Sequence, residues 1–435
     1  MIRVAIVTFI SWSLLATAVA AQEARRRWER MNTIRQEKFD HILPEVMREN
    51  GIDMWITMIR EANYGTLHAD LGHGYTMEHG YYVFTDRGGD RIERSVLGIS
   101  GYRLERSGAW DHFLPVSDFA SFVEERDPQR IGLNISRSIG PADQLTHAGY
   151  EQIVETLGER FRDRLVPAEK LVSDFRSRRV ASEIAAFAEA GEISRRLAER
   201  AFSNEVIVPG VTRLEEVAWW LMDRLLEEGL GSSFGLPSIY VTGPEGIEAI
   251  SDERIVQRGD LLMIDWGVGY LNFYTDMKRI AYVLRDGETE VPAALQHAFD
   301  RGREARTVIQ GAIQPGMTAA EAHEKIYAAL EAEGFARIAF NQPTDDPETT
   351  DVVIGCHSVG NTGHGIGPSI AEFNPVRFGY VLHPTNLLSI ELFAYTSNPD
   401  WSGKKVRIPL EDDAVVTERG VEWLYPPNDR ILLIR

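Results

Sequence analysis

The chain contains very little cysteine: Cys356 is the only one in 435 residues. A single thiol excludes a disulfide within the chain, so the fold must rest on its hydrophobic core or on bound metal. No partner at a known motif spacing supports Cys356 as a ligand or a nucleophile. We therefore interpret it as a core residue.

Positive charge is also scarce. The 46 Lys and Arg residues are outnumbered by 65 Asp and Glu residues, which gives a formal net charge of −19. Nucleic acids and anionic membrane surfaces both require clustered basic side chains. The composition therefore argues against nucleic acid and membrane surfaces as partners, and it leaves a peptide or small-molecule substrate open.

A signal-like hydrophobic run occurs at the N-terminus. Residues 1–21 contain a basic position, Arg3, then an apolar run from Val4 to Leu15 and the small-residue sequence AVA at 18–20. This order is typical of a cleaved signal peptide. The run is short for a membrane span and is broken by Ser and Thr, so an uncleaved anchor is the less favoured alternative. We expect an exported protein, periplasmic or secreted, without stable membrane insertion.

The length and the 44% hydrophobic content allow two domains. Alternating strand and helix patterns predict an α/β first domain over residues 22–172. Its strands are expected at 51–59, 81–86, 94–100 and 130–136, and its helices at 32–50 and 116–125. The stretch SDFRSRRVASE (173–183) is interpreted as a linker that leads into a long helix over 184–202. Residues 173–435 then form the second domain.

The second domain contains an internal repeat. Residues 209–229 read PGVTRLEEVAWWLMDRLLEEG, and residues 315–334 read PGMTAAEAHEKIYAALEAEG. In each copy Thr is expected as the N-cap with Glu three positions later, and Gly ends the helix. Because both copies share the order helix, Pro-Gly-Thr, helix, Glu-Gly and strands, we predict a duplicated half-domain with a site between the halves.

Two acids interrupt a hydrophobic stretch in the first copy, LLMIDWGVGYLNFYTD (261–276). A hairpin that turns between Tyr270 and Leu271 would place Asp265 directly opposite Asp276, with Cβ atoms about 5 Å apart. Half-buried carboxylates at that distance repel unless a proton or a cation lies between them. We therefore predict bound metal, with two ions, while a hairpin with both acids on its wet face is the alternative.

The second copy supplies comparable residues. Glu391 interrupts the apolar strand LLSIELF (387–393), and Glu411 opens a strand in LEDDAVVTERG (410–420). His364 lies between glycines in NTGHGIGP (361–368), where the backbone can pack close to whatever the imidazole contacts. Four carboxylates and one histidine divided between two repeats favour a shared metal site.

The segments IDWGVGYLNFYTDMKR, GHGIG, SIEL and LEDDAVVTERG, in this order, resemble the metallopeptidases of the pita-bread fold. These are methionine aminopeptidase, aminopeptidase P and prolidase, with the metal-free creatinase as a relative. The resemblance covers roughly residues 175–435, and the first domain resembles the creatinase-type N-terminal domain. It implies an α/β (α+β) fold in which a smaller N-terminal domain is followed along the chain by a duplicated pita-bread catalytic domain.

The resemblance also implies the roles of five residues. Asp276 and Glu411 would bridge two divalent ions, Asp265 would complete one site, and His364 with Glu391 would complete the other. Glu391 would also take the proton of the attacking water as general base. We expect manganese, with cobalt, zinc or iron as alternatives, and an exported aminopeptidase that hydrolyses peptides with proline in the second position.

This sequence departs from the proline-specific relatives near the substrate. They hold a histidine ahead of the first metal Asp, whereas residues 241–260 here contain none. Their second histidine is Ala371 here, and their Arg two residues before the last metal Glu is Pro409. We expect Arg407 to bind substrate instead. His357, in a segment that resembles creatinase, is a candidate for one lost catalytic function, and a buried structural histidine is the equal alternative.

Three histidines lie close together in LHADLGHGYTMEHGYY (67–82) of the first domain. Their spacings match no common zinc motif, so a mobile loop is the default interpretation. In the resembling enzymes the N-terminal domain of a neighbouring subunit helps to wall the active site. We therefore expect a homodimer and hypothesise that His73 and His79 supply substrate contacts.

Two other functions stay open. The missing histidines favour a hydrolase or lyase of the same fold that acts on a non-peptide substrate. A catalytically silent binding protein is the other possibility. The five retained ligand positions argue against it, because a silent pocket gains nothing from carboxylates that repel one another.

Overall fold

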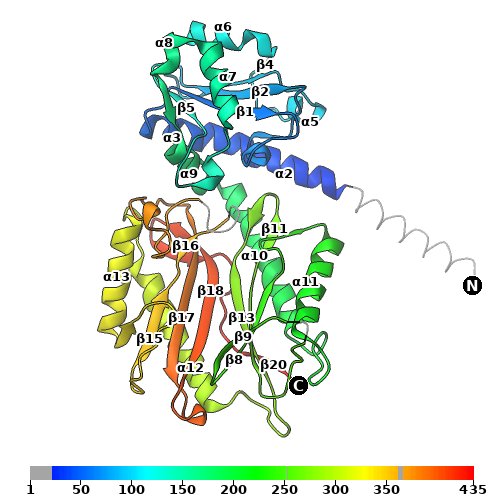
Figure 1. Cartoon of the computed structure of the whole chain (residues 1–435), viewed down its shortest axis with the longest axis vertical. Coiled ribbons are helices and arrows are strands. Elements are labelled where there is room, and N and C mark those ends of the chain that lie inside the picture. The colour runs from blue at the N-terminus through cyan, green and yellow to red at the C-terminus, as the bar shows by residue number, and fades with distance from the viewer. Residues whose placement is uncertain (1–21, 252, 361–365) are drawn as a thin grey trace, which may run out of the picture. The chain divides into compact units, whose positions relative to one another are not determined.

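The structure is a computed structural model that describes residues 22–251, 253–360 and 366–435. The predicted signal peptide, 1–21, lies outside these ranges. The chain divides into two compact units, of which the first ends at Phe175 and the second runs from Arg176 to Arg435 (Figure 1). Within the described ranges no helix is both long and apolar enough to cross a membrane.

The first unit is built on a six-stranded mixed sheet in the order β4-β3-β2-β1-β5-β6. Its strands are β1 Met54–Arg60, β2 His79–Thr85, β3 Glu93–Leu97, β4 His112–Leu114, β5 Ile131–Leu133 and β6 Leu165–Pro167. β1 pairs antiparallel with β2 and parallel with β5. The strands predicted from the sequence are all present, and the buried residues of β1 and β2 pack against α6 and α7 in one core.

The helices of the first unit are short apart from the N-terminal one. They are α2 Glu23–Glu37, α3 Leu43–Glu49, α4 His68–Leu71, α5 Tyr102–Glu105, α6 Phe119–Arg126, α7 His147–Leu157, α8 Glu159–Arg162 and α9 Glu169–Ser177. A π-helical turn, Lys38–Ile42, joins α2 to α3. The linker predicted at 173–183 is wrong in its first part, because residues 173–177 are the end of α9 and bury Phe175.

The second unit contains an 11-stranded sheet, whose main path is β14-β15-β17-β18-β13-β10-β8-β9. The strands on this path are β8 Ser238–Gly243, β9 Gly246–Ala249, β10 Leu261–Trp266, β13 Met277–Val283, β14 Phe335–Arg337, β15 Thr350–Ile354, β17 Leu387–Ser397 and β18 Lys405–Thr417. The other three strands of this sheet are β16 His357–Ser358, β19 Gly420–Trp423 and β20 Leu432–Ile434. A separate three-stranded sheet has the order β12-β11-β7, with β7 Gly231–Ser232, β11 Val268–Tyr270 and β12 Phe273–Tyr274.

Two pairs of helices cover this sheet. They are α10 Ala181–Ala201 with α11 Leu214–Glu228, and α12 Ala293–Ala312 with α13 Ala319–Ala332. Figure 1 shows α11 and α13 at opposite sides of the second unit. Leu262 and Ile264 of β10 share a core with α10 and α11, and Ile390 of β17 and Ile408 of β18 share one with α12 and α13. Each copy of the repeat therefore has its own helix pair and core.

The strand order reflects the duplication predicted from the sequence. β8, β10 and β13 belong to the first copy, β15, β17 and β18 to the second, and the copies meet where β13 pairs with β18. Thr318 caps α13 as expected, with Glu321 accepting a hydrogen bond from its N–H. The matching cap in the first copy is one residue later than predicted: Arg213, not Thr212, precedes α11, and Glu216 accepts its N–H.

Candidate metal centre

The turn between β11 and β12 sets the register of the predicted site. Its two central residues, Leu271 and Asn272, both have positive φ, and Tyr270 pairs with Phe273. Two residues of positive φ form the kind of two-residue turn that matches the twist of a hairpin. The turn is therefore one residue later than predicted, and Asp265 lies opposite Lys278 instead of Asp276.

This register places four charged side chains in one row across the centre of the sheet. Asp265 on β10 pairs with Lys278 on β13, Lys278 with Glu411 on β18, and Glu411 with Glu391 on β17. Side chains of directly paired residues project from the same face of a sheet. The row therefore carries one positive and three acidic groups, and it crosses the junction between the two copies of the repeat.

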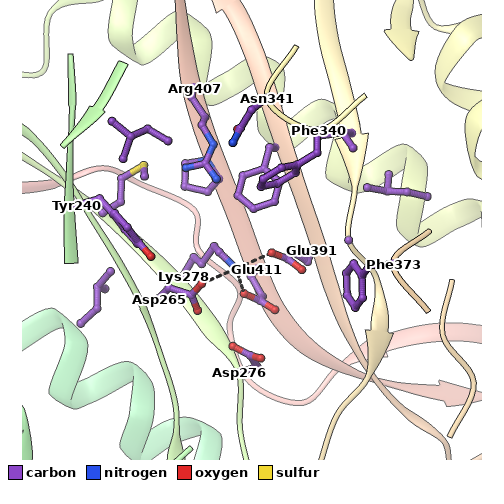
Figure 2. Close-up of a pocket in the computed structure, with 18 of the residues that line it drawn as sticks. Tyr240, Asp265, Asp276, Lys278, Phe340, Asn341, Phe373, Glu391, Arg407 and Glu411 are labelled. Atoms are coloured by element: carbon purple, nitrogen blue, oxygen red, sulfur yellow. Dashed lines mark hydrogen bonds and ion pairs between the residues drawn. The ribbon is translucent and has the colours of Figure 1, made fainter. Parts of the chain in front are cut away.

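Lys278 contacts all three acids of the row (Figure 2). Its Nζ lies 2.6 Å from Glu391 Oε1 and 3.1 Å from Asp265 Oδ2, and it donates a hydrogen bond to Glu411 Oε2. The Lys278 side chain is 8% exposed. An ammonium group has three N–H donors, and here each one faces a carboxylate.

Asp276 and His357 lie beside this row. Asp276 comes just before β13, two residues from Lys278, and its N–H donates to Asp413 Oδ2 at 3.2 Å. His357, on β16, is fully buried, with Nε2 at 3.6 Å from Glu411 Oε1 and 3.9 Å from Asp276 Oδ2. Its Nδ1 lies 2.9 Å from the Ser358 carbonyl oxygen. A hydrogen bond from Nδ1–H to a carbonyl leaves Nε2 as the nitrogen that can ligate a metal.

One group of side chains in the described part of the chain has the spacing of a metal site: Asp276, His357 and Glu411, whose ligand atoms lie within 4.8 Å of one another. Asp276 Oδ1 is buried and accepts no hydrogen bond from any described residue. Two carboxylates and an imidazole suit Mn, Fe, Co or Zn, so these three residues fit one divalent ion. Such an ion would lower the pKa of a water molecule and polarise a carbonyl group.

The two carboxylates that complete the two sites in the family resemblance, Asp265 for one ion and Glu391 for the other, are arranged differently. Asp265 and Glu391 are already bonded to Lys278. His364, the predicted histidine ligand, lies in 361–365, outside the described residues. Among the described residues, the row therefore offers no open site for a second ion.

A second set of buried contacts holds the ligands in place. The Ser389 hydroxyl donates to Glu411 Oε1, and the Tyr425 hydroxyl donates to Asp413 Oδ2 at 2.9 Å. Asp413 in turn accepts the N–H of Asp276, as described above. Partners of this kind orient metal ligands, and their loss commonly costs about 10- to 100-fold in metal affinity.

Burial and mutual repulsion raise the pKa values of three of these acids, whereas nearby positive charges lower that of the fourth. Burial and the charge of Glu411 raise the pKa of Glu391 to about 7, and they raise the pKa of Asp276 well above its ordinary value. Burial also raises the pKa of Asp265, against the attraction of Lys278. Glu411 is buried too, but the charges of Lys278 and His357 outweigh this and lower its pKa to about 2.

These directions predict how metal binding depends on pH. An acid whose folded pKa is raised stabilises the fold below its ordinary pKa, and this contribution is lost as the pH rises through the folded value. Metal ligands must be deprotonated, and two of the candidate ligands, Asp276 and His357, have raised pKa values, so protons compete with the ion at low pH. We expect the increase in Tm on adding Mn²⁺ to metal-free protein to grow between pH 5 and 7. A shift that is constant or shrinks over this range would contradict the assignment.

The row and its neighbours open into a cavity of about 700 Å³. Aromatic side chains line it, among them Phe393 and, as Figure 2 shows, Phe340 and Phe373. Arg407, two strand positions before Pro409 on β18, places its guanidinium 4.0 Å from the centre of the Phe393 ring. The cavity thus combines an acidic floor, in which Lys278 lies, with apolar walls and the cationic group of Arg407.

The structure brings most of the predicted site residues together and adds one. Asp265, Asp276, Glu391 and Glu411 meet as expected, and Arg407 lines the same cavity. His357, predicted as a catalytic substitute, is placed to ligate metal. Lys278 was missed, although a lysine two positions after Asp276 in a strand, and therefore on the same face, is a detectable signal.

The two predicted histidines of the first unit do not form a metal site among the described residues. His73 is exposed, with its ring 4.6 Å from the ring of His68. His79 begins β2, and the Gln152 side chain lies within 3.2 Å of its imidazole. The segment is partly helical and partly strand instead of a loop throughout. Their predicted contact with substrate stays a prediction.

The sequence itself places the chain among known proteins. The profile of metallopeptidase family M24 matches residues 185–418, which is more than half of the chain. One relative is the uncharacterized peptidase YqhT of Bacillus subtilis (strain 168). It is 25% identical over 354 residues, and the alignment covers 78% of this chain and 84% of that protein.

Solved structures share the fold at lower identity. The X-Pro aminopeptidase from Thermotoga maritima aligns with a TM-score of 0.63 at 19% identity, covering 89% of this chain and 99% of that one. The Xaa-Pro dipeptidase from Bacillus anthracis aligns with a TM-score of 0.59 at 20% identity, covering 94% and 100%. The second unit thus has the pita-bread fold behind a mixed-sheet N-terminal unit. With the profile match and the buried Asp, His and Glu ligands at the junction of its two halves, the chain belongs to metallopeptidase family M24.

Proposed function

We propose that this protein is a metal-dependent aminopeptidase that hydrolyses peptides with proline in the second position. The observation that carries the proposal is the position of the candidate metal ligands Asp276 and Glu411 in the floor of a cavity with apolar walls. A proline ring is compact and apolar, so it suits walls made by Phe340, Phe373 and Phe393. The X-Pro aminopeptidase and Xaa-Pro dipeptidase that share the fold support the same substrate class.

Within this proposal each residue has a defined task. Asp276, His357 and Glu411 hold the ion, for which manganese is the first candidate and cobalt, zinc or iron the alternatives. Glu391 accepts the proton of the attacking water, because its carboxylate lines the cavity beside the ligands and its pKa is raised to about 7. Lys278 keeps the Glu391 carboxylate oriented through the contact of 2.6 Å.

The proposal extends to the setting of the enzyme. The basic and apolar pattern of residues 1–21 supports export by a cleaved signal peptide, to the periplasm or the medium. A homodimer, in which His73 and His79 contact substrate, is proposed from the family resemblance. N-terminal sequencing of the protein recovered from outside the cytoplasm tests the export, with cleavage near Ala21 as the expected result.

Substrate profiling tests the activity. The mature protein, loaded with Mn²⁺, is assayed against pairs of peptides that differ only in Pro or Ala at the second position. We expect hydrolysis of the Pro member, with release of the first residue, and much slower hydrolysis of the Ala member. Equal rates would exclude the proposed proline specificity, and no turnover of any peptide would exclude the peptidase activity.

Arg407 provides a sharper prediction about substrate binding. Its guanidinium lies on the cavity wall, where it can pair with a carboxylate of a bound peptide. We expect Arg407→Met to raise KM about tenfold, which corresponds to about 1.4 kcal/mol, with little change in kcat. Lys404→Met is the control, because Lys404 is exposed, pairs with Glu245 and does not line this cavity. An unchanged KM for the Arg407 variant would exclude this role.

A second candidate function rests on the missing histidines. Residues 241–260 contain no histidine, and Ala371 stands where the resembling enzymes have another. Because such side chains contact peptide substrates in those enzymes, their loss favours a small non-peptide amide or ester. Hydrolysis of simple amides, together with no turnover of any peptide in the substrate profile, would support this alternative over the peptidase.

A further inference from the structure

We infer that the ammonium group of Lys278 takes the place of a second metal ion, so that the centre binds one divalent ion per chain. The inference about Lys278 rests on the proposed function in one respect, because it assumes that Asp276, His357 and Glu411 hold metal. It departs from the two-ion centre that the family resemblance implies.

The first argument is geometric. Lys278 is held from both sides by strand pairing, opposite Asp265 on β10 and opposite Glu411 on β18. Its Nζ contacts one oxygen of each acid in the row, at the point where a shared cation would have to lie. Glu411 links this position to the metal ligands, because Oε2 accepts from Lys278 while Oε1 lies 3.6 Å from His357 Nε2.

The second argument is the saturation of the donors. The three N–H groups of an ammonium have three carboxylate partners here, so Lys278 needs no water or further ligand. A metal ion placed among Asp265, Glu391 and Glu411 would have to displace it. The displaced ammonium would then lose two charge-assisted hydrogen bonds and an ion pair in a site where its side chain is 8% exposed.

The third argument is charge. When ionised, the four carboxylates that face one another, Asp265, Asp276, Glu391 and Glu411, carry −4, and Lys278 reduces this to −3. One divalent ion then leaves −1, whereas two would leave +1. The two totals are equally far from zero, but a second ion would also lie beside the ammonium, and buried like charges repel strongly. A single ion beside Lys278 avoids this repulsion between cations.

Metal stoichiometry tests the inference without relying on activity. The metal-free protein is equilibrated with excess Mn²⁺, freed of unbound ion, and measured by elemental analysis and electron paramagnetic resonance. We expect one ion per chain and the spectrum of an isolated Mn²⁺. Two ions with a spin-coupled spectrum, or no bound ion, would overturn the inference.

Variants at two buried lysines test whether Lys278 is the residue that excludes a second ion. Lys278→Ala removes the ammonium and opens its space, so we expect it to bind two ions. Lys405→Ala is the matched control, because Lys405 is another buried lysine of the same unit, 2.7 Å from Asp351, and lies outside the centre. The Lys405→Ala variant should keep one ion. If folded Lys278→Ala still binds only one, Lys278 is not what excludes the second; if that variant does not fold, the stoichiometry and spectrum of the natural protein decide.

The same measurements separate this inference from the proposed substrate. A protein with one ion that fails to cleave any Xaa-Pro peptide keeps the inference and loses the proposed activity. A protein with two coupled ions that cleaves such peptides loses the inference and keeps the proposed activity.

Discussion

Replacing Glu411 by glutamine is expected to abolish metal binding and to destabilise the second unit by about 3–5 kcal/mol. Glu411 is fully buried and lies between the Lys278 ammonium, bonded to Oε2, and the His357 imidazole, beside Oε1. Its removal takes from Lys278 one of three carboxylate partners and from His357 the nearest one, and the loss of a partner by a buried charge is costly. The loss of a direct ligand should weaken Mn²⁺ binding by more than the 10- to 100-fold typical of outer partners.

Urea denaturation and a Mn²⁺ titration of the Glu411→Gln variant measure both effects. Glu422→Gln is the control, since Glu422 lies on the neighbouring strand β19 in an exposed pair with Arg419 and should change neither quantity. A Glu411 variant with natural stability and natural affinity for Mn²⁺ would show that this carboxylate is not at the centre of the site.

Replacing Glu391 by glutamine is expected to lower kcat by about 10²- to 10⁴-fold while the ion stays bound. Glutamine keeps the size of the side chain, but it cannot accept the proton of the attacking water. Glu391 is not one of the three residues whose ligand atoms cluster, so the metal content should remain at one ion per chain. The measurement is steady-state kinetics on an Xaa-Pro peptide, paired with elemental analysis of the same sample.

Glu372→Gln gives the matched control for this experiment. Glu372 lines the same cavity, but it pairs with Arg337 and His323 instead of contacting the centre. It should retain kcat within a small factor. A Glu391 variant that keeps full activity would require another base, and one that loses its metal would make Glu391 a ligand.

Much of the fold could be predicted because its signals are local. The apolar runs of β1 and β2 and the capping box at Thr318 depend on residues close in sequence. The duplication could be recognised because the same order of local signals occurs twice. By contrast, α9 was mistaken in part for a linker, since the basic run that contains Arg178 and Arg179 conceals residues that are buried.

The site shows where prediction from the sequence ends. Interrupted strands point to Asp265, Asp276, Glu391 and Glu411, because an acid in an apolar strand needs a reason to be buried. The row that joins them depends on strand register, and the register depends on which two residues adopt positive φ in the turn. An error of one residue in the turn hid Lys278, which is the partner of three of the four acids.

The most direct test of the account is the anomalous scattering of crystals grown with Mn²⁺, measured at the manganese absorption edge. The account predicts one strong peak per chain, surrounded by Asp276, His357 and Glu411, with the Lys278 ammonium still bonded to Asp265, Glu391 and Glu411. A peak in the position of the ammonium, or no peak among the three ligands, would contradict it.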